Sequence, residues 1–184
     1  VINYFVLGDQ VVMSPVFVGP EPVWADGGKY EGTIVMPEEP AAGLRFMRML
    51  DESQQSNARL QKETGPVNAL AEAVNDNPVV SYEGIRGDEL SKEQKEGLLN
   101  LIGVYVGYKK KGHAKVRMEE VAAHLDETHF SWIGETEDDS VFYYRVHSPV
   151  IYIEFDHQRP IGLERTGVPS QNHIHAVVRT PNGN

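Results

Sequence analysis

The amino-acid sequence predicts an α+β domain, an antiparallel sheet with helices packed on one face. Runs rich in β-branched and aromatic residues lie near both ends of the chain, within residues 1–18 and 128–180. Between them, apolar residues recur at helical spacing within residues 38–60 and 91–125. Strands followed by helices and then by strands again favour a layered fold in which the helices share one side of the sheet.

The first two strands are predicted to form a hairpin. Residues 1–7 and 10–18 are separated by Gly8 and Asp9, a short turn signal between two β-rich runs. A connection with several glycines and prolines follows, and residues 33–36 are predicted to add one more short strand.

A helix is predicted over residues 38–60, with a possible break near Asp51. Pro37 and the two glutamates after it suit a first helical turn, where no intrahelical N–H is needed. The apolar side chains that recur at helical spacing are Leu44, Met47 and Leu50.

Residues 64–88 are predicted to be a loop-rich linker inside the domain, because glycine, proline, asparagine and aspartate cluster there. Only residues 67–74 have a helical pattern within it. Ser91 and Gln94 then have the spacing of a capping box, in which each side chain bonds to the other residue's backbone amide. A helix is therefore expected from this point to the lysine run and glycine at residues 109–112.

The rest of the chain predicts one more helix over residues 114–125 and then four strands, over residues 128–134, 141–147, 150–157 and 173–180. We expect a single domain that spans residues 1–184. Because Val1 lies inside a strand-like run and Asn184 directly follows another, we also expect the chain to be a fragment of a longer protein.

Composition excludes several classes of function. The chain has 27 acidic and 17 basic residues and a net charge of −10, so a phosphate backbone is an unfavourable partner and nucleic acid is not expected. With no cysteine, disulfides, thiolate nucleophiles and cysteine-ligated zinc are excluded. No run approaches the roughly 20 apolar residues that a membrane span requires.

Familiar catalytic motifs are also absent from the sequence. It contains no phosphate-binding glycine loop, no Gly-x-Ser-x-Gly nucleophile elbow and no His-Glu-x-x-His helix. Common nucleotide-dependent and serine-hydrolase mechanisms are therefore disfavoured.

The pair His173 and His175 is the first candidate for chemistry. In a strand, alternate residues project to the same face, so both imidazoles are predicted to point the same way. Two such imidazoles form half of many zinc, iron and copper sites. The alternative is a half-buried strand whose histidines are only hydrogen-bonded.

A second candidate is the strand that ends at His157. There Tyr152, Glu154 and Asp156 alternate with apolar residues, so two carboxylates and a tyrosine share the face opposite the core. If that face lines a cleft, Glu154 or Asp156 could complete a metal site or act as a general base. His157 would join them only at a bulge or at the end of the strand. If the face is solvated, these are ordinary surface residues.

Arg145 lies in the preceding strand, on one face with Tyr143 and His147. It is expected to oppose Glu154 across the ladder, either as a structural ion pair or as a group that binds an anion. Arg145 and Glu154 are therefore the candidate catalytic residues, and His173, His175, His157 and Glu154 are the candidate metal ligands.

Four segments together closely resemble the C-terminal signature of the domain-of-unknown-function family DUF3500: residues 130–134 (FSWIG), 142–150 (FYYRVHSPV), 153–157 (IEFDH) and 173–184, which begin with HIH. The opening hairpin and residues 42–46 also resemble that family, so the likeness covers essentially the whole chain. It implies a fold and candidate positions without implying a reaction.

The resemblance implies further partners for the histidine pair. Members of the family are longer on both sides, and their pattern has a Gly-His-His-Leu segment just before the position of Val1. Two more imidazoles on that segment would converge with His173 and His175. Relatives with export signals imply a secreted or periplasmic protein.

Two functional hypotheses follow. The first is a metal-dependent enzyme, a hydrolase or an oxidoreductase, in which zinc, iron or copper is held at His173 and His175 and activates water or dioxygen. The second is a non-catalytic binding or assembly module that uses the aromatic-rich strands, with Trp132, Tyr143, Tyr144 and Tyr152 on its surface. In that case its partners would be the missing N-terminal segment of the same protein or further copies of the chain.

Overall fold

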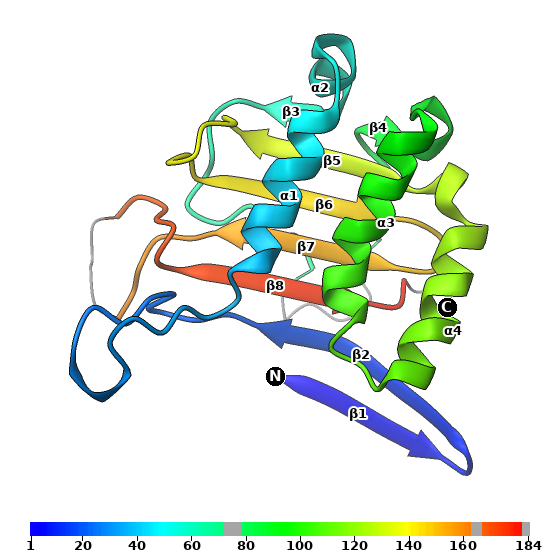
Figure 1. The fold of residues 1–184 in the computed structure, drawn as a ribbon, viewed down its shortest axis with the longest axis horizontal. Helices are drawn as coiled ribbons and strands as arrows, with labels where there is room; N and C mark the ends of the chain where they lie inside the picture. The colour runs from blue at the N-terminus through cyan, green and yellow to red at the C-terminus, as the bar shows by residue number, and fades with distance from the viewer. Residues whose placement is uncertain (72–78, 163–166, 182–184) are drawn as a thin grey trace.

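A computed structural model gives the fold, and it describes residues 1–71, 79–162 and 167–181 (Figure 1). The helices are α1 (Glu38–Met49), α2 (Glu52–Ala58), α3 (Lys92–Val106) and α4 (Lys111–Ala123). The strands are β1 (Ile2–Leu7), β2 (Gln10–Val18), β3 (Arg59–Gln61), β4 (Ile85–Arg86), β5 (His129–Gly134), β6 (Phe142–His147), β7 (Tyr152–His157) and β8 (Ile174–Arg179). The predicted α+β class is confirmed.

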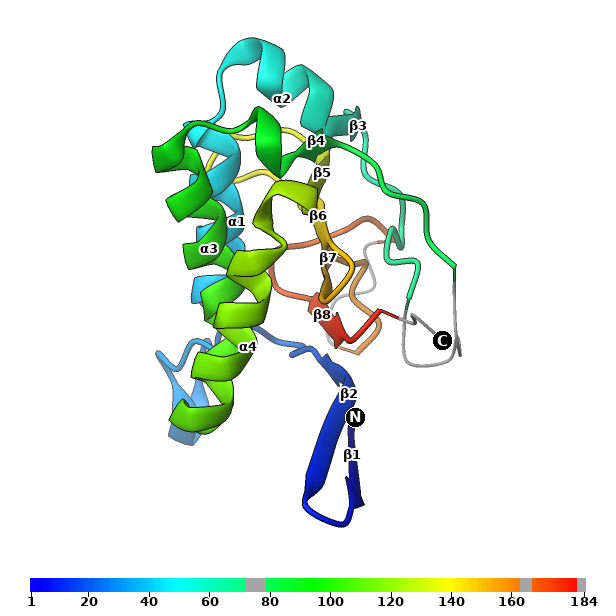
Figure 2. The same ribbon diagram turned by 90° about the vertical axis from the view of Figure 1, so that its right-hand side faces the viewer.

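The strands form one sheet in the order β1-β2-β8-β7-β6-β5-β3, with β4 paired to β5. All the pairings are antiparallel except that of β3 with β5. Figure 2 shows α1, α3 and α4 on one side of this sheet and the long connections on the other side. The expected helical layer on one face is therefore present.

The helix break predicted near Asp51 is confirmed, because α1 ends at Met49 and Asp51 caps α2. The Asp51 side chain accepts a hydrogen bond from the Gln54 backbone amide, and the Gln54 side chain bonds back to the Asp51 amide. Ser91 and Gln94 form the capping box that was predicted for α3.

Three local predictions differ from the structure. Residues 33–36 do not form a strand, because only Ile34 is paired, through an isolated bridge to Trp24. Residues 67–71 are not helical, and residues 72–74 of that prediction lie outside the described residues. The expected linker over residues 64–88 contains β4, which lies on β5.

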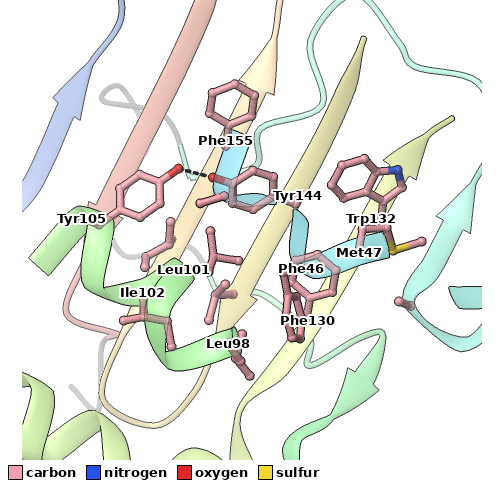
Figure 3. Packing of buried hydrophobic residues seen from close by; sticks show 14 of the residues in the cluster. Phe46, Met47, Leu98, Leu101, Ile102, Tyr105, Phe130, Trp132, Tyr144 and Phe155 are labelled. Atoms are coloured by element: carbon pink, nitrogen blue, oxygen red, sulfur yellow. Dashed lines mark hydrogen bonds between the residues drawn. The ribbon is translucent and has the colours of Figure 1, made fainter. Parts of the chain in front are cut away.

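The core fills the space between the helical layer and the sheet (Figure 3). Aromatic rings from the sheet meet aliphatic and aromatic side chains of α1 and α3; the labelled members of this cluster are Phe46, Met47, Leu98, Leu101, Ile102, Tyr105, Phe130, Trp132, Tyr144 and Phe155. Each large apolar side chain buried here contributes about 1.5–3 kcal/mol to stability.

Two buried tyrosine hydroxyls cross this core as a hydrogen-bonded chain. The Tyr105 hydroxyl donates to that of Tyr144, which donates to the Glu39 carbonyl oxygen at 2.8 Å. Burial raises the pKa of both tyrosines. The Tyr144 ring also lies so close to Gly43 of α1 that a β-carbon at that position would overlap it.

We predict that Gly43→Ala destabilises the protein by about 1–3 kcal/mol, because the new methyl group forces α1 away from the Tyr144 ring. Gly103→Ala in α3 is the matched control, since a β-carbon there meets open space. It should leave stability unchanged or raise it by up to about 1 kcal/mol through helix propensity. Urea unfolding of both variants measures the difference, and equal effects would contradict the packing described for α1.

Candidate functional site

The face of the sheet opposite the helices carries a buried polar surface. Directly opposed pairs on this face are Tyr143 with Asp156, Arg145 with Glu154, and Asp156 with His175. Arg145 is only 1% exposed, and Glu154 and Asp156 are fully buried. Strand alternation predicts this shared face, but charged groups need hydrogen-bonding partners when they are removed from water.

The segment that supplies these partners lies over the polar face, and we call it the strap: residues 65–71 and 79–84 (Figure 2). Glu154 accepts hydrogen bonds from the backbone amides of Leu70 and Ala71 at 2.7 and 2.8 Å. The Tyr143 hydroxyl donates to the same carboxylate at 2.7 Å. Glu154 therefore holds the strap through both of its carboxylate oxygens.

Asp156 binds the strap at Asn68 and Ala69, the two residues that precede the Glu154 contacts. Its Oδ2 accepts from the backbone amides of Asn68 at 2.8 Å and Ala69 at 3.2 Å, and from the Gln158 side chain at 3.2 Å. Its Oδ1 accepts from the Asn68 side-chain amide at 2.8 Å. Burial raises the pKa of Asp156, while these four donors act in the opposite direction.

Arg145 meets the other arm of the strap. Its guanidinium forms an ion pair with Glu83 at 2.5 Å and donates to the Ser81 carbonyl oxygen at 3.5 Å. Arg145 stands directly opposite Glu154 in the ladder, as expected, but the ion pair that the structure gives it is with Glu83. Both candidate catalytic residues are thus engaged with the strap.

A tyrosine ring on the strap also covers two histidines of the sheet. The Tyr82 ring stacks on His147 with centroids 4.1 Å apart and lies 5.1 Å from the His129 ring. Burial, together with the neighbouring Arg145, lowers the pKa of His147 to about 4. The ring therefore sits neutral beneath the strap at neutral pH.

The histidine pair lies at the start of β8 with its ring nitrogens converging. The Nε2 atoms of His173 and His175 are 3.1 Å apart, and the two rings are almost perpendicular. His173 is buried and His175 half-buried. The prediction that both imidazoles project from one side of the chain into a common space therefore agrees with the structure.

A backbone carbonyl fixes the tautomer of His173. Its Nδ1 lies 2.8 Å from the Arg159 carbonyl oxygen, which can only accept, so Nδ1 carries the proton and Nε2 is the acceptor of the ring. The Glu21 carboxylate is 3.8 Å from the same Nδ1 and also accepts from the backbone amides of Ile161 and Gly162. The loop that follows β7 is thus tied to His173.

His175 packs against Phe17 of β2 and against Gly19, just after that strand ends. The edge of the Phe17 ring meets it with centroids 4.8 Å apart, and a β-carbon at Gly19 would overlap both its ring and the Ile174 carbonyl oxygen. Gly19 therefore lets β2 pass close to the pair. The sequence marks Gly19 only as part of a connection, so this role was missed.

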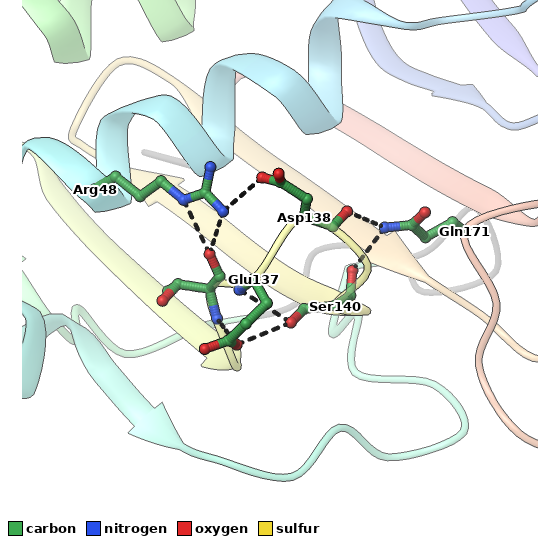
Figure 4. A network of polar contacts seen from close by, with 6 residues as sticks. Arg48, Glu137, Asp138, Ser140 and Gln171 are labelled. Atoms are coloured by element: carbon green, nitrogen blue, oxygen red, sulfur yellow. Dashed lines mark hydrogen bonds and ion pairs between the residues drawn. The ribbon is translucent and has the colours of Figure 1, made fainter.

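The segment that leads into the pair is anchored to the β5–β6 loop (Figure 4). The Gln171 side chain donates to the backbone carbonyls of Asp138 and Ser140, both at 3.0 Å. Arg48 of α1 bonds the same loop through the Thr136 carbonyl and the Asp138 carboxylate. The approach to His173 is therefore fixed from a distant part of the chain.

His157 lies on the other face of the sheet from Asp156, in the helix-covered core. Its Nδ1 is 3.0 Å from the backbone N and O of Phe142, and its ring meets those of Phe142 and Phe155 edge-on. No bulge turns it over, so the structure does not bring this candidate ligand to the histidine pair. Burial lowers its pKa to about 4.

The structure does not gather a complete set of ligands. Within residues 1–71, 79–162 and 167–181, no three histidine, aspartate or glutamate side chains come together around one metal position. None of the helices in these ranges has the length and apolar character needed to traverse a bilayer. The four aromatic residues expected on a binding surface, Trp132, Tyr143, Tyr144 and Tyr152, are all buried.

Comparison with known proteins gives one match. A family model described as "Protein of unknown function (DUF3500)" matches residues 1–184. No curated protein and no solved structure matches the chain.

We predict that acid destabilises the fold through His157. Its pKa falls from 6.5 in the unfolded chain to about 4 in the folded one, so between these values only the unfolded chain takes up the proton. Stability is therefore full above pH 6.5 and declines as the pH falls to about 4, by up to about 3 kcal/mol from this group.

Urea unfolding between pH 7 and pH 4 measures this dependence. In His157→Gln the slope against pH should be shallower, whereas the same change at the exposed His113 should leave it as in the wild type. A His157→Gln slope equal to that of the wild type would contradict the assignment.

Proposed function

The chain belongs to the DUF3500 family over its whole length, and we propose that it binds a divalent transition-metal ion through His173 and His175. The observation that carries this proposal is the 3.1 Å separation of their Nε2 atoms, with the other nitrogen of His173 bonded to a backbone carbonyl. A second nitrogen held in this way is the usual arrangement of a metal-ligating histidine.

The separation fits a shared ion. Two imidazole nitrogens, each about 2.05 Å from a tetrahedral ion, stand about 3.3 Å apart. The observed 3.1 Å needs only a small movement of one ring. Contact with the Phe17 ring and the close approach of the Gly19 backbone limit the movement of His175. These contacts support a pair that is already oriented for binding.

A proton must move from one nitrogen of the His175 ring to the other when metal binds. Because His173 Nε2 has no proton, the hydrogen bond between the rings is donated by His175 Nε2–H. A metal ion takes the place of this proton, and His175 then carries its proton on Nδ1. Binding therefore requires neutral imidazoles and weakens at acidic pH.

Two imidazoles favour zinc, iron or copper over calcium or magnesium, which prefer oxygen ligands. When bound, such an ion supplies Lewis-acid activation of water or redox chemistry with dioxygen, so we propose a metal-dependent hydrolase or oxidoreductase. Glu154 and Arg145 are proposed to act beside it as base and anion-binding group once they part from the strap. His157 is left out of the proposed ligands because it lies in the core.

Remaining ligands are proposed to come partly from another segment of the same protein. The resemblance to the family includes a Gly-His-His-Leu segment before the position of Val1. Val1 is hydrogen-bonded to Phe17 of β2, whose ring contacts that of His175. Imidazoles from such a segment would approach the pair from the β2 side.

We predict that the wild-type protein binds about one Zn²⁺ per chain and that the His173→Ala, His175→Ala double variant loses this binding. Isothermal titration calorimetry and elemental analysis after dialysis measure the stoichiometry. His113→Ala is the control, since that exposed histidine lies on α4 away from the pair. Equal zinc uptake by the wild type and the double variant would refute the proposal.

A specific surface supports the second hypothesis, an assembly module. Strand β1 is the outer strand of the sheet, and its apolar side chains are exposed, including Phe5 at 64% and Leu7 at 69%. An exposed apolar edge strand pairs readily with another strand. We propose that β1 joins either a second copy of the chain or another segment of the same protein.

We predict that the wild-type chain self-associates as its concentration rises and that Phe5→Lys with Leu7→Lys keeps it monomeric, because charge on an edge strand opposes pairing. Size-exclusion chromatography with light scattering measures the mass. Leu60→Lys on β3, at the other end of the strand order, also replaces an exposed apolar residue and is the control. A wild type that stays monomeric at every concentration would argue against pairing between copies.

A further inference from the structure

We propose that a groove between the β1–β2 hairpin and the helices α3 and α4 binds a small organic carboxylate with an apolar body. The groove has a volume of about 660 Å³. Sites for small molecules have volumes of roughly 300–1,000 Å³. None of the described residues that line the groove belongs to the histidine pair or to the strap, so this inference is independent of the proposed metal site.

The groove is apolar where the hairpin and the helices face each other. Figures 1 and 2 both place the junction of α3 and α4 beside the hairpin. Tyr4, Val12 and Met13 line the groove from the hairpin, and Tyr108 and Val116 line it from the helices. Tyr4, Tyr108 and Val116 are 64–67% exposed, so an apolar ligand placed between them would remove a large apolar area from water.

The helix side of the groove is also basic. Lys109, Lys110 and Arg117 line it together with a single acidic residue, Glu120. Residues 109–117 contain five of the 17 basic residues in a chain whose net charge is −10. Positive charge concentrated in one part of an acidic protein favours an anionic ligand at that place.

The two lysines have no ionic partner inside the protein. Among the described residues, no carboxylate lies within ion-pair distance of Lys109 or Lys110. Lys109 is half-buried, and burial together with the nearby Arg117 lowers the pKa of its ammonium group. A carboxylate bound beside Lys109 would compensate for both effects.

Arg117 has donor capacity that the fold does not use. Its two terminal nitrogens donate to the Glu120 carboxylate, the Val150 carbonyl oxygen and the Thr180 hydroxyl. Its Nε is buried and has no acceptor within the part of the chain that the structure describes. The guanidinium is therefore fixed in place at the groove with one N–H still able to donate to a ligand.

The start of α4 adds to the positive character of the groove. Lys110 precedes the helix without a side-chain cap, and the first turn contains no acidic residue. The free backbone amides of a first helical turn favour negative charge, but here they lie beside lysines. A bound anion would improve the electrostatics of this end of α4.

The combination of surfaces selects a small amphipathic anion. An inorganic anion would leave the apolar wall exposed, whereas a neutral apolar molecule would separate the half-buried ammonium group of Lys109 from water without pairing it. Nucleic acid and anionic membranes are disfavoured, because the net charge of −10 repels a highly charged surface. A monovalent carboxylate does not meet that repulsion to the same degree.

The first test uses octanoate as the probe, in isothermal titration calorimetry with the whole chain. Octanoate should bind with a stoichiometry of about one per chain. Acetate, which has the charge without the apolar body, and 1-octanol, which has the body without the charge, should each bind at least about 10-fold more weakly. If either one binds as tightly as octanoate, or if octanoate does not bind, the inference is wrong.

Variants assign the binding to the groove. Lys109→Met removes the charge but keeps the length of the side chain, so octanoate should bind about 10-fold more weakly while 1-octanol is unaffected. Lys92→Met is the matched control, since this exposed lysine lies at the other end of α3. An octanoate affinity that is the same in Lys109→Met as in Lys92→Met would overturn the assignment.

A second pair of variants covers the case in which Lys109→Met does not fold. Val116 is 65% exposed, so its replacement should leave the fold intact. Val116→Asp places a like charge beside the ligand and should weaken octanoate binding by at least about 10-fold, whereas Val116→Leu should preserve it. Equal octanoate affinities in these two variants would contradict the proposed site.

Sedimentation with phosphatidylglycerol vesicles distinguishes a small ligand from a membrane surface. The protein should stay in the supernatant, because the groove is proposed to take a free carboxylate. Co-sedimentation that Lys109→Met abolishes, in a protein that does not bind octanoate, would show a membrane-binding surface instead and would overturn the inference.

Discussion

The structure depends on the hydrogen bonds that the two buried carboxylates of β7 accept from the strap. Glu154 and Asp156 are fully buried in a chain whose net charge is already negative, and each one would be costly without donors. The strap provides them through consecutive backbone amides, from Asn68 to Ala71. Because backbone amides lie at fixed intervals along the chain, the spacing of the two carboxylates on β7 determines the path of the strap across the sheet.

Strand β7 therefore contacts both the helical layer and the strap. On one face Ile153 and Phe155 pack into the helix-covered core, and on the other Glu154 and Asp156 bind the strap. The two layers are stabilised by different forces. Burial of apolar area holds the helices, while the strap exposes Leu70 and Tyr82 and is held largely by charge-assisted hydrogen bonds. The strap is therefore the part whose stability depends on these two carboxylates.

Sequence patterns predicted the features that depend on local periodicity. Alternation placed Tyr152, Glu154 and Asp156 on one face. The capping box at Ser91 marked the start of α3, and the break expected near Asp51 lies where α2 begins. The partners of the polar face could not be predicted, since the strap is irregular chain far away in sequence and its donors are backbone amides. A backbone carbonyl such as that of Arg159 has no residue signature, so the tautomer of His173 was equally inaccessible. His157 was predicted as a metal ligand because it follows two carboxylates in the sequence. The regular alternation of β7 instead points its odd-numbered residues, His157 included, into the core.

The position of the histidine pair follows from the same constraints. The pair lies where β8 begins, between β2 and the end of β7, so three separate segments limit its movement: Gly19 and Phe17, the loop held by Glu21, and the Gln171 anchor. Holding two imidazoles 3.1 Å apart costs little stability, because a hydrogen bond joins them. Asp156, which stands opposite His175 in the β7–β8 ladder, is likewise satisfied by Asn68. The histidine pair and the strap are therefore held by hydrogen bonds that the fold itself supplies, and both can form as the chain folds.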